Sequence, residues 1–257
     1  MGVRMMKSPE VALFVTCLAD LMRPSVGFAA VKLLEDAGCA VSVPMAQTCC
    51  GQPAYTGGDR AAAGAIAARV IAAFEGYEYI VAPSGSCAAM IRQHYPALFD
   101  GDADMSSRAR AVGGRTYELI TFLTEVLGVD TVNAEYQGVA TYHDSCSGLR
   151  EMGIKPQPRK LLRRVRGLEL KESLEAETCC GFGGSFCVEY PGISQRMTDG
   201  KIDDIEASGA DTLLAGDLGC LLTIAARLQG RGSPIKVRHV AEVLAGIADD
   251  VAPVGEG

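Results

Sequence analysis

Two adjacent cysteine pairs are the residues of this sequence whose types and spacing could do chemistry. Cys49 and Cys50 lie in the stretch TCCGQP, and Cys179 and Cys180 lie in TCCGFG, each pair between a threonine and a glycine. Cysteine thiolates bind zinc, bind iron-sulfur clusters or form redox-active disulfides. The repeated pair therefore indicates a metal site or a redox site, and the surrounding residues must discriminate between them.

Lone cysteines recur with each pair. In the first half, 31 residues separate Cys17 from the pair, and 36 residues separate the pair from Cys87. In the second half, 32 residues follow Cys146 before the pair, and 39 residues precede Cys220. This repeat of four cysteines indicates a duplicated unit.

The remaining two of the ten cysteines, Cys39 and Cys187, fall outside the pattern. Free cysteine often behaves as a small apolar residue, and we interpret both as buried. We expect a first cysteine-rich repeat in residues 1–130 and a second in residues 131–257.

Short apolar stretches alternate with longer helical patterns, which predicts an α/β fold of two pseudo-symmetric βαβ-type repeats with mainly parallel sheets. The expected strands are 11–16, 40–43, 79–83, 138–142, 212–215 and 235–237. The expected helices are 25–37, 59–75, 87–95, 116–127, 156–165, 193–208, 218–229 and 238–247. Residues 99–114, rich in Asp, Ser and Gly, are expected to form an exposed loop. Sites in such folds lie beyond the carboxyl ends of strands, where we expect the cysteines to cluster.

Four thiolates from three loops suit either a tetrahedral zinc ion or an iron-sulfur cluster. Structural zinc sites usually take two ligands from one short C-x2-4-C knuckle, whereas neighbouring cysteines tend to point their side chains apart. Adjacent thiolates reach separate irons of a larger cluster more easily than one zinc ion. The spacing therefore favours an iron-sulfur cluster in each half.

The stretches CCGQPAY, PSGSCAAM, YHDSCSGLRE, CCGFGGSF and EYPGIS resemble the CCG cysteine-rich domain family. That family includes the cysteine-rich subunit of heterodisulfide reductase and the iron-sulfur subunit of glycolate oxidase, and the resemblance to its two-repeat lactate-utilization members covers nearly the whole chain. It implies a cytoplasmic electron-transfer subunit with one [4Fe-4S] cluster per repeat. It further implies a non-catalytic or co-catalytic role in a complex that oxidises L-lactate to pyruvate, with a ferredoxin-like iron-sulfur protein and a third subunit as partners.

The sequence departs from the heterodisulfide reductase pattern at one position in each half. In that pattern the last cysteine belongs to a C-x-x-C motif, whose first position is Ser84 in one half of this chain and Asp217 in the other. An ordinary four-iron cluster, a cluster with an oxygen ligand from Asp217, and a repeat without a cluster are all compatible with this change. His143 and Asp144, just before Cys146, are further candidates for tuning or binding a cluster, or they satisfy backbone groups.

Composition excludes several classes of protein. The formal net charge of −7 argues against nucleic-acid binding, and no apolar run is long enough to predict an integral membrane protein. The glycines of GFGGSF do not form a dinucleotide fingerprint, so neither NAD nor flavin is expected. Two alternatives remain: a zinc-stabilised interaction module, and a thiol-disulfide oxidoreductase that uses the vicinal cysteines.

Overall fold

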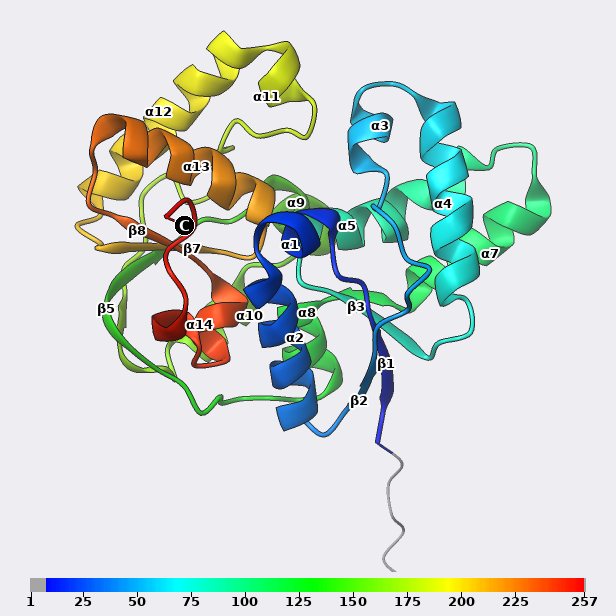
Figure 1. Ribbon diagram of the computed structural model, residues 1–257, viewed down its shortest axis with the longest axis horizontal. Coiled ribbons are helices and arrows are strands. Elements are labelled where there is room, and N and C mark those ends of the chain that lie inside the picture. Colours follow the sequence, from blue (N-terminus) through cyan, green and yellow to red (C-terminus); the bar gives the residue numbers. More distant parts are fainter. Residues whose placement is uncertain (1–7, 257) are drawn as a thin grey trace, which may run out of the picture.

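The computed structural model describes residues 8–256 and contains two four-stranded sheets (Figure 1). The first sheet consists of β1 (Glu10–Leu13), β2 (Ala40–Ser42), β3 (Tyr79–Ala82) and β4 (Thr116–Glu118). The second consists of β5 (Glu135–Tyr142), β6 (Arg166–Leu170), β7 (Thr212–Ala215) and β8 (Lys236–His239). The orders β2-β1-β3-β4 and β6-β5-β7-β8 are equivalent, and every strand pair is parallel. The predicted α/β fold of two repeated units is therefore confirmed.

Helices connect the parallel strands, because such strands need crossover connections. In the first half they are α1 (Cys17–Met22), α2 (Pro24–Asp36), α3 (Gln52–Thr56), α4 (Arg60–Phe74), α5 (Gly85–Ala89), a π-helical turn (Met90–His94), α6 (Tyr95–Leu98), α7 (Ala103–Gly114), α8 (Leu119–Thr121) and a second π-helical turn (Phe122–Val126). In the second half they are α9 (Cys146–Met152), α10 (Pro156–Leu162), α11 (Phe186–Glu189), α12 (Pro191–Ala207), α13 (Leu218–Arg231), α14 (Val240–Leu244) and a 3-10 turn (Ala248–Asp250). None of the helices within residues 8–256 is long and apolar enough to cross a membrane.

The structure corrects the expectation that residues 99–114 form an exposed loop. Most of this segment is helix α7, which Asp102 caps by accepting a hydrogen bond from the backbone N–H of Met105 at 3.0 Å. Ala109 and Val112 are fully buried on its inner face. Sparse apolar residues at helical spacing therefore outweighed the loop-like composition of the segment.

Two strands were absent from the sequence-based expectation. β4 occupies the start of the expected helix 116–127, because a three-residue strand leads directly into α8. β6 lies at an edge of the second sheet and has the sequence RGLEL. Its charged residues interrupt the apolar run by which a strand is recognised. Charged residues are typical of edge strands, which apolar runs therefore do not identify.

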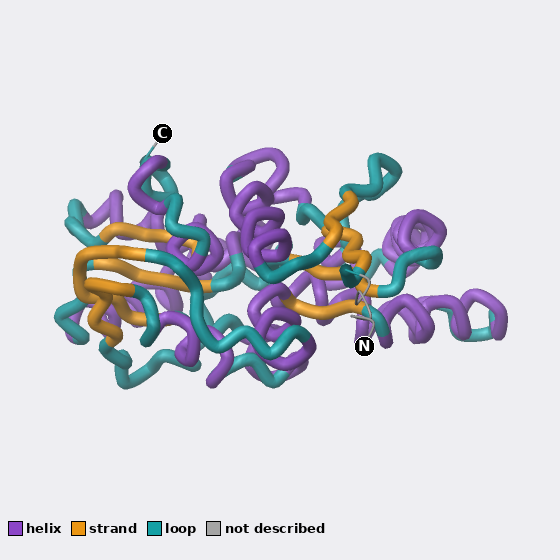
Figure 2. The backbone as a smooth tube through the Cα atoms, turned by 90° about the horizontal axis from the view of Figure 1, so that it is seen from below, coloured by secondary structure: helices purple, strands orange, loops and turns teal. Residues whose placement is uncertain are grey.

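Both halves contribute to the largest group of contacting core residues. It includes Leu13 and Leu34 from the first half together with Leu161 and Leu244 from the second. Helices α2, α8, α10 and α14 lie between the two sheets in Figure 1, and Figure 2 shows helices between the two groups of strands. A buried ion pair adds to this junction, because Arg23 Nε donates to the fully buried carboxylate of Glu242 at 2.8 Å. The two repeats thus pack as one body.

Helices α5 and α9 cross closely where the repeats meet. A Cβ atom added to Gly85 would lie only 2.8 Å from the Cα of Gly148. Backbone at that distance cannot shift as a flexible side chain can, so glycine is needed there for close approach rather than for conformational freedom.

Gly85→Ala is therefore expected to lower the free energy of unfolding by about 1–3 kcal/mol through overpacking. Urea denaturation measures this value. Gly200→Ala is the matched control, because a Cβ at Gly200 in α12 meets nothing within 4 Å. The control should be as stable as the parent or more stable by up to about 1 kcal/mol, because alanine favours helix. Equal midpoints for the two variants would contradict the predicted clash.

Candidate metal or iron-sulfur site

The eight patterned cysteines lie on loops and first helical turns that face the centre of the molecule. Each lone cysteine lies in the first turn of the helix that follows a strand: Cys17 in α1, Cys87 in α5, Cys146 in α9 and Cys220 in α13. Each pair lies in the loop before a short helix, Cys49–Cys50 before α3 and Cys179–Cys180 before α11. The sequence-based expectation placed these residues beyond the carboxyl ends of parallel strands, and the structure gathers them there in two groups.

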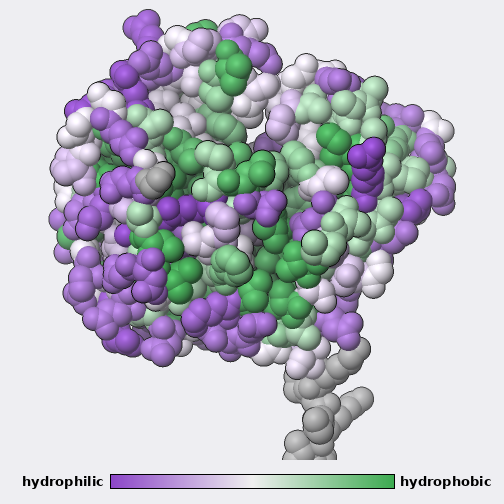
Figure 3. All heavy atoms as spheres, viewed as in Figure 1, coloured by the Kyte–Doolittle hydropathy of each residue, from purple (hydrophilic) through white to green (hydrophobic). Residues whose placement is uncertain are grey.

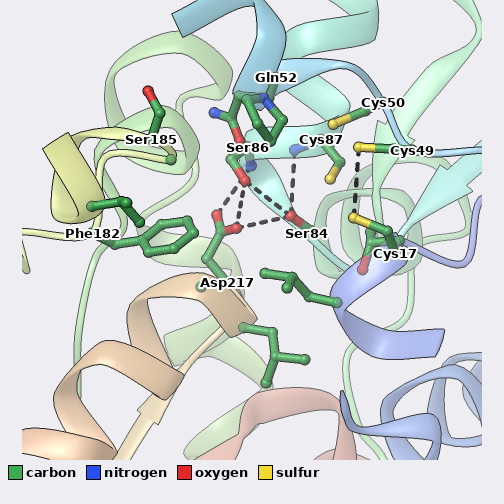
Figure 4. A pocket seen from close by; sticks show the side chains of 17 residues that line it. Cys17, Cys49, Cys50, Gln52, Ser84, Ser86, Cys87, Phe182, Ser185 and Asp217 are labelled. Atoms are coloured by element: carbon green, nitrogen blue, oxygen red, sulfur yellow. Dashed lines mark hydrogen bonds between the residues drawn. The ribbon is translucent and has the colours of Figure 1, made fainter. Parts of the chain in front are cut away.

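The four cysteines of the first repeat lie close together around one cavity (Figure 4). The Sγ atoms of Cys17 and Cys49 are 3.6 Å apart. The thiols of Cys49 and Cys87 lie near enough to Cys50 to raise its pKa. Three separate loops therefore bring four thiols to one place.

The second repeat has an equivalent group of thiols. Cys146 and Cys180 lower the pKa of Cys179, and Cys179 and Cys220 raise that of Cys180. All ten cysteines of the chain lie in its described part and are free thiols. The repeated sequence pattern thus corresponds to a repeated arrangement of sulfurs.

In each group, one thiol has a lowered pKa that favours the thiolate form. Hydrogen bonds from the thiols of Cys17 and Cys50 lower the pKa of Cys49 to about 2, and the N–H of Gly51 points at the same sulfur from 3.4 Å. In the second repeat, hydrogen bonds from Cys146 and Cys180 lower the pKa of Cys179 to about 2. Since metals bind thiolates rather than thiols, these electrostatics suit a metal site.

The backbone of each pair is held in place. Tyr95 donates its hydroxyl to the carbonyl of Cys50 at 2.9 Å, and Thr198 donates to that of Cys180 at 2.8 Å. Gly181 adopts φ +88°, and a Cβ there would lie 2.6 Å from the carbonyl oxygen of Ser194. The glycine after the second pair is therefore required both for the turn and for the packing of α12.

Two cavities lie side by side between the repeats. One of about 280 Å³ is lined by the four patterned cysteines of the first repeat, and one of about 290 Å³ is lined by Cys146, Cys179, Cys180 and Cys220 of the second. Both cavities are also lined by Gln52, Ser86, Phe182, Gly184 and Asp217. These five residues form a wall common to the two sites.

Ser84 and Asp217, each three residues before the last patterned cysteine of its repeat, hydrogen-bond to each other (Figure 4). Asp217 Oδ1 accepts from the hydroxyls of Ser84 at 2.8 Å and Ser86 at 2.6 Å. Its Oδ2 accepts from the Ser86 N–H at 3.0 Å and the Ser145 hydroxyl at 2.9 Å. In this arrangement Asp217 joins the loop of Cys87 to the loop of Cys146.

Asp144 is held in a buried ion pair. Arg159 donates to both of its carboxylate oxygens at 2.8 Å and also reaches Glu172. The guanidinium lies 5.2 Å from the ring centroid of Tyr142. Through this ion pair, Asp144 fixes the position of the segment between β5 and Cys146.

His143 has a different environment. It is 1% exposed, and neither ring nitrogen makes a hydrogen bond. Burial, together with the nearby ammonium of Lys201, lowers its pKa to about 3. The ring is therefore neutral at physiological pH, which is the form that binds metals.

The two cysteines outside the repeat differ from each other. Cys39 is buried in the core, as expected. The expectation was wrong for Cys187, which is half-buried in α11 and donates its thiol to the Gly184 carbonyl at 3.4 Å. None of the four residues of this short helix is buried.

Several residues of the site were not identified from the sequence. Ser86 and Ser145 belong to the motifs PSGSC and HDSC, whose hydroxyl side chains next to cysteines were the available signal. Phe182 and Lys201 gave no signal, because an aromatic in a glycine-rich loop and a lysine in a helix are both ordinary.

The cysteines that line each cavity suit a metal ion or an iron-sulfur group. Four thiolates on a tetrahedral zinc ion, with bonds of about 2.3 Å, lie roughly 3.8 Å from one another. Among the described residues, the one group of three metal-binding side chains within 4.8 Å of one another is His143, Cys180 and Cys220. In the first repeat, the sulfurs of Cys17 and Cys49 are 3.6 Å apart, close to the separation of two thiolates on zinc.

Known proteins share this sequence and fold. The family model described as "Cysteine-rich domain" (CCG) matches residues 11–92 and 140–225. Lactate utilization protein A of Geobacillus sp. (strain WCH70) is 49% identical over 235 residues, which cover 91% of this chain and 98% of the relative. Lactate utilization protein A of Exiguobacterium sp. (strain ATCC BAA-1283 / AT1b) is 49% identical over 238 residues, which cover 92% and 97%.

A solved structure resembles the fold at low sequence identity. The crystal structure of a hypothetical protein from Helicobacter pylori has a TM-score of 0.63 and 14% identity, and the match covers 95% of this chain and 50% of the other. This likeness concerns the fold alone. With two matches to the cysteine-rich domain and full-length relatives at 49% identity, the chain belongs to the CCG cysteine-rich domain family and, within it, to the lactate utilization protein A group.

Proposed function

We propose that this chain is an iron-sulfur electron-transfer subunit of a system that oxidises L-lactate to pyruvate. The observation that carries the proposal is the twofold occurrence of four converging thiols on three loops. The names of its full-length relatives support a role in lactate utilisation. We assign the first site to Cys17, Cys49, Cys50 and Cys87, the second to Cys146, Cys179, Cys180 and Cys220, and one [4Fe-4S] cluster to each.

The protein's own groups suit this role. The N–H groups of Gly51 and Gly181 point at a sulfur in each site, and such hydrogen bonds raise the reduction potential of a cluster. Each cluster would take up and release one electron. Since oxidation of L-lactate to pyruvate releases two electrons and two protons, a chain with two clusters matches the electron count.

The cavities do not suit binding of lactate itself. A carboxylate substrate is normally held by a cationic side chain. The ionisable residues other than cysteine that line the two cavities within the described chain are Asp217, His94, Glu151 and Tyr55, and His94 already pairs with Glu151 at 2.9 Å. We therefore assign substrate oxidation to another subunit of the system.

An apolar surface over the first site suits a partner protein. Figure 3 shows apolar residues gathered in the middle of one face, over the junction of the halves. Leu21 and Met22 at the end of α1 are 76% and 62% exposed, and Met45 is 94% exposed. A surface groove lined by Leu21, Met45, Cys17 and Cys49 connects this patch to the first site. We assign this face to a redox partner, with a ferredoxin-like iron-sulfur protein and a third subunit completing a cytoplasmic complex.

Metal analysis of anaerobically purified protein tests the proposal. We expect a brown protein with about four irons and four sulfides per repeat that bleaches on reduction. Cys50→Ser should lose about half of the iron, whereas Cys39→Ser, in the core away from both sites, should keep all of it. Stoichiometric zinc, or protein without metal, would overturn the assignment and favour an interaction module or a dithiol oxidoreductase.

A further inference from the structure

His143 and Phe14 occupy equivalent places in the two repeats. Each lies three residues before the first cysteine of its repeat. The N–H of Phe14 donates to the carbonyl of Val81 in β3 at 2.8 Å, and that of His143 donates to Leu214 in β7 at 2.8 Å. The duplicated backbone therefore carries an aromatic hydrocarbon at this position in one repeat and an imidazole in the other.

The two rings have different partners. Phe14 is fully buried and packs against Phe74 with ring centroids 5.5 Å apart. His143 is equally buried, yet both of its nitrogens lack a hydrogen bond. Buried polar groups without partners are costly and rare, and phenylalanine already fills this position in the first repeat. Packing alone therefore does not account for a histidine here.

The imidazole lies beside the sulfurs of the second site. One ring nitrogen and the Sγ atoms of Cys180 and Cys220 all lie within 4.8 Å of one another, and all three residues are buried. The carbonyl of Ala176 lies close enough to the ring to act on its charge. A histidine that binds a metal through one nitrogen commonly directs the other at such an acceptor.

The carboxylates nearest the second site already have partners. Asp217 accepts four hydrogen bonds from three serines, and Asp144 is paired with Arg159. Among the described residues, His143 is the unpartnered side chain whose ring nitrogen lies within 4.8 Å of the sulfurs of both Cys180 and Cys220.

We propose that His143 is a nitrogen ligand of the iron-sulfur group in the second repeat, where it takes the place of one of the four thiolates assigned above, so that this site is chemically distinct from the all-thiolate site of the first repeat. The inference rests on the iron-sulfur function proposed above. A neutral imidazole in an iron-sulfur ligand set raises the reduction potential relative to thiolate ligands alone. The second site therefore has the higher potential, and electrons entering at the first site pass to the second.

Isotope-resolved EPR of the full-length protein tests this inference. The chain has three histidines, so ring-15N-labelled histidine marks few positions. The protein is loaded and reduced anaerobically, and electron-nuclear double resonance is recorded for labelled and unlabelled samples. We expect a nitrogen coupling of the strength found for directly bound imidazole, which changes on labelling.

Variants assign the coupling to a residue. His143→Phe copies the first repeat and should abolish the coupling, lower the potential of one of the two clusters and leave the other unchanged. His239→Gln is the matched control: His239 is equally buried in the same repeat, where its Nδ1 caps α14 by accepting from the Ala241 N–H at 3.2 Å. The control should keep both the coupling and the two potentials.

Each outcome decides between the alternatives. Two clusters without any histidine coupling, or with the weak coupling of a hydrogen bond to sulfur, would overturn ligation by His143 and leave the proposed function intact. Absence of iron would overturn the proposed function first. The comparison of labelled and unlabelled parent protein needs no variant, so it decides the question even if His143→Phe does not fold.

Discussion

Asp217→Ala is expected to lower the free energy of unfolding by about 3 kcal/mol and to weaken metal retention in both repeats at once. The carboxylate accepts hydrogen bonds from Ser84, Ser86 and Ser145 at 2.6 to 3.0 Å. Its removal leaves buried donors without a charged acceptor, at a cost of about 1–3 kcal/mol per buried group, part of which the serines regain by bonding to each other. Urea denaturation measures the stability, and iron analysis after anaerobic purification measures retention.

The effect on both sites follows from where the serines lie. Ser84 and Ser86 precede Cys87 in the first repeat, and Ser145 precedes Cys146 in the second, so one carboxylate holds a ligand loop of each site. Asp203→Ala is the control, because Asp203 pairs with Arg231 at the surface and should change stability by less than about 0.5 kcal/mol. Loss of iron from one repeat only, with unchanged stability, would show that Asp217 does not connect the sites.

This role of Asp217 could not be predicted from the sequence. An aspartate directly before a helix ordinarily caps that helix, but the side chain of Asp217 makes no cap to α13 and bonds instead to serines 72 and more than 130 residues away. Contacts between distant loops depend on how the repeats pack, which no local pattern encodes. The cysteine positions were predictable for the opposite reason: parallel strands bring their carboxyl ends to one edge, so spacing along the chain indicates proximity.

The prediction of the fold was also limited to features that the local residue pattern reveals. Strands with apolar runs, such as β3 and β7, were evident, whereas the charged edge strand β6 was not. His143 could be identified as a candidate beside Cys146, but its sequence context does not reveal that the ring lacks partners. Burial without hydrogen bonds is a property of the packed protein, and it separates His143 from the equally buried Asp144.

Stability of the junction between the repeats is also expected to depend on pH through Glu118. Its carboxylate is 3% exposed, accepts a hydrogen bond from the Thr121 N–H at 2.9 Å and lies near Asp217. Burial, together with the charge of Asp217, raises its pKa from 4.5 to about 7. Because the folded state binds this proton more tightly than the unfolded state, the stabilisation is complete below pH 4.5 and is lost as the pH rises through about 7.

Glu118→Gln keeps the acceptor for Thr121 and removes the charge. The variant should therefore match the parent near pH 4.5 and exceed its stability by about 3 kcal/mol at pH 8.5, as a shift of that size implies. Denaturation of both proteins across this pH range gives the difference.

Glu242→Gln supplies a control of opposite sign. Burial favours the protonated form of Glu242, but hydrogen bonds from Arg23 and Ser25 outweigh it and lower the pKa. Ionised Glu242 therefore stabilises the protein above pH 4.5, and its replacement should be most costly at neutral pH and less costly in acid. The prediction fails if the stability difference between Glu118→Gln and the parent stays constant with pH while Glu242→Gln shows its expected change. That result would mean that Glu118 is ionised in the folded protein. In that case its carboxylate and that of Asp217 would carry two negative charges at the junction, and Asp217→Ala would relieve repulsion as well as remove hydrogen bonds.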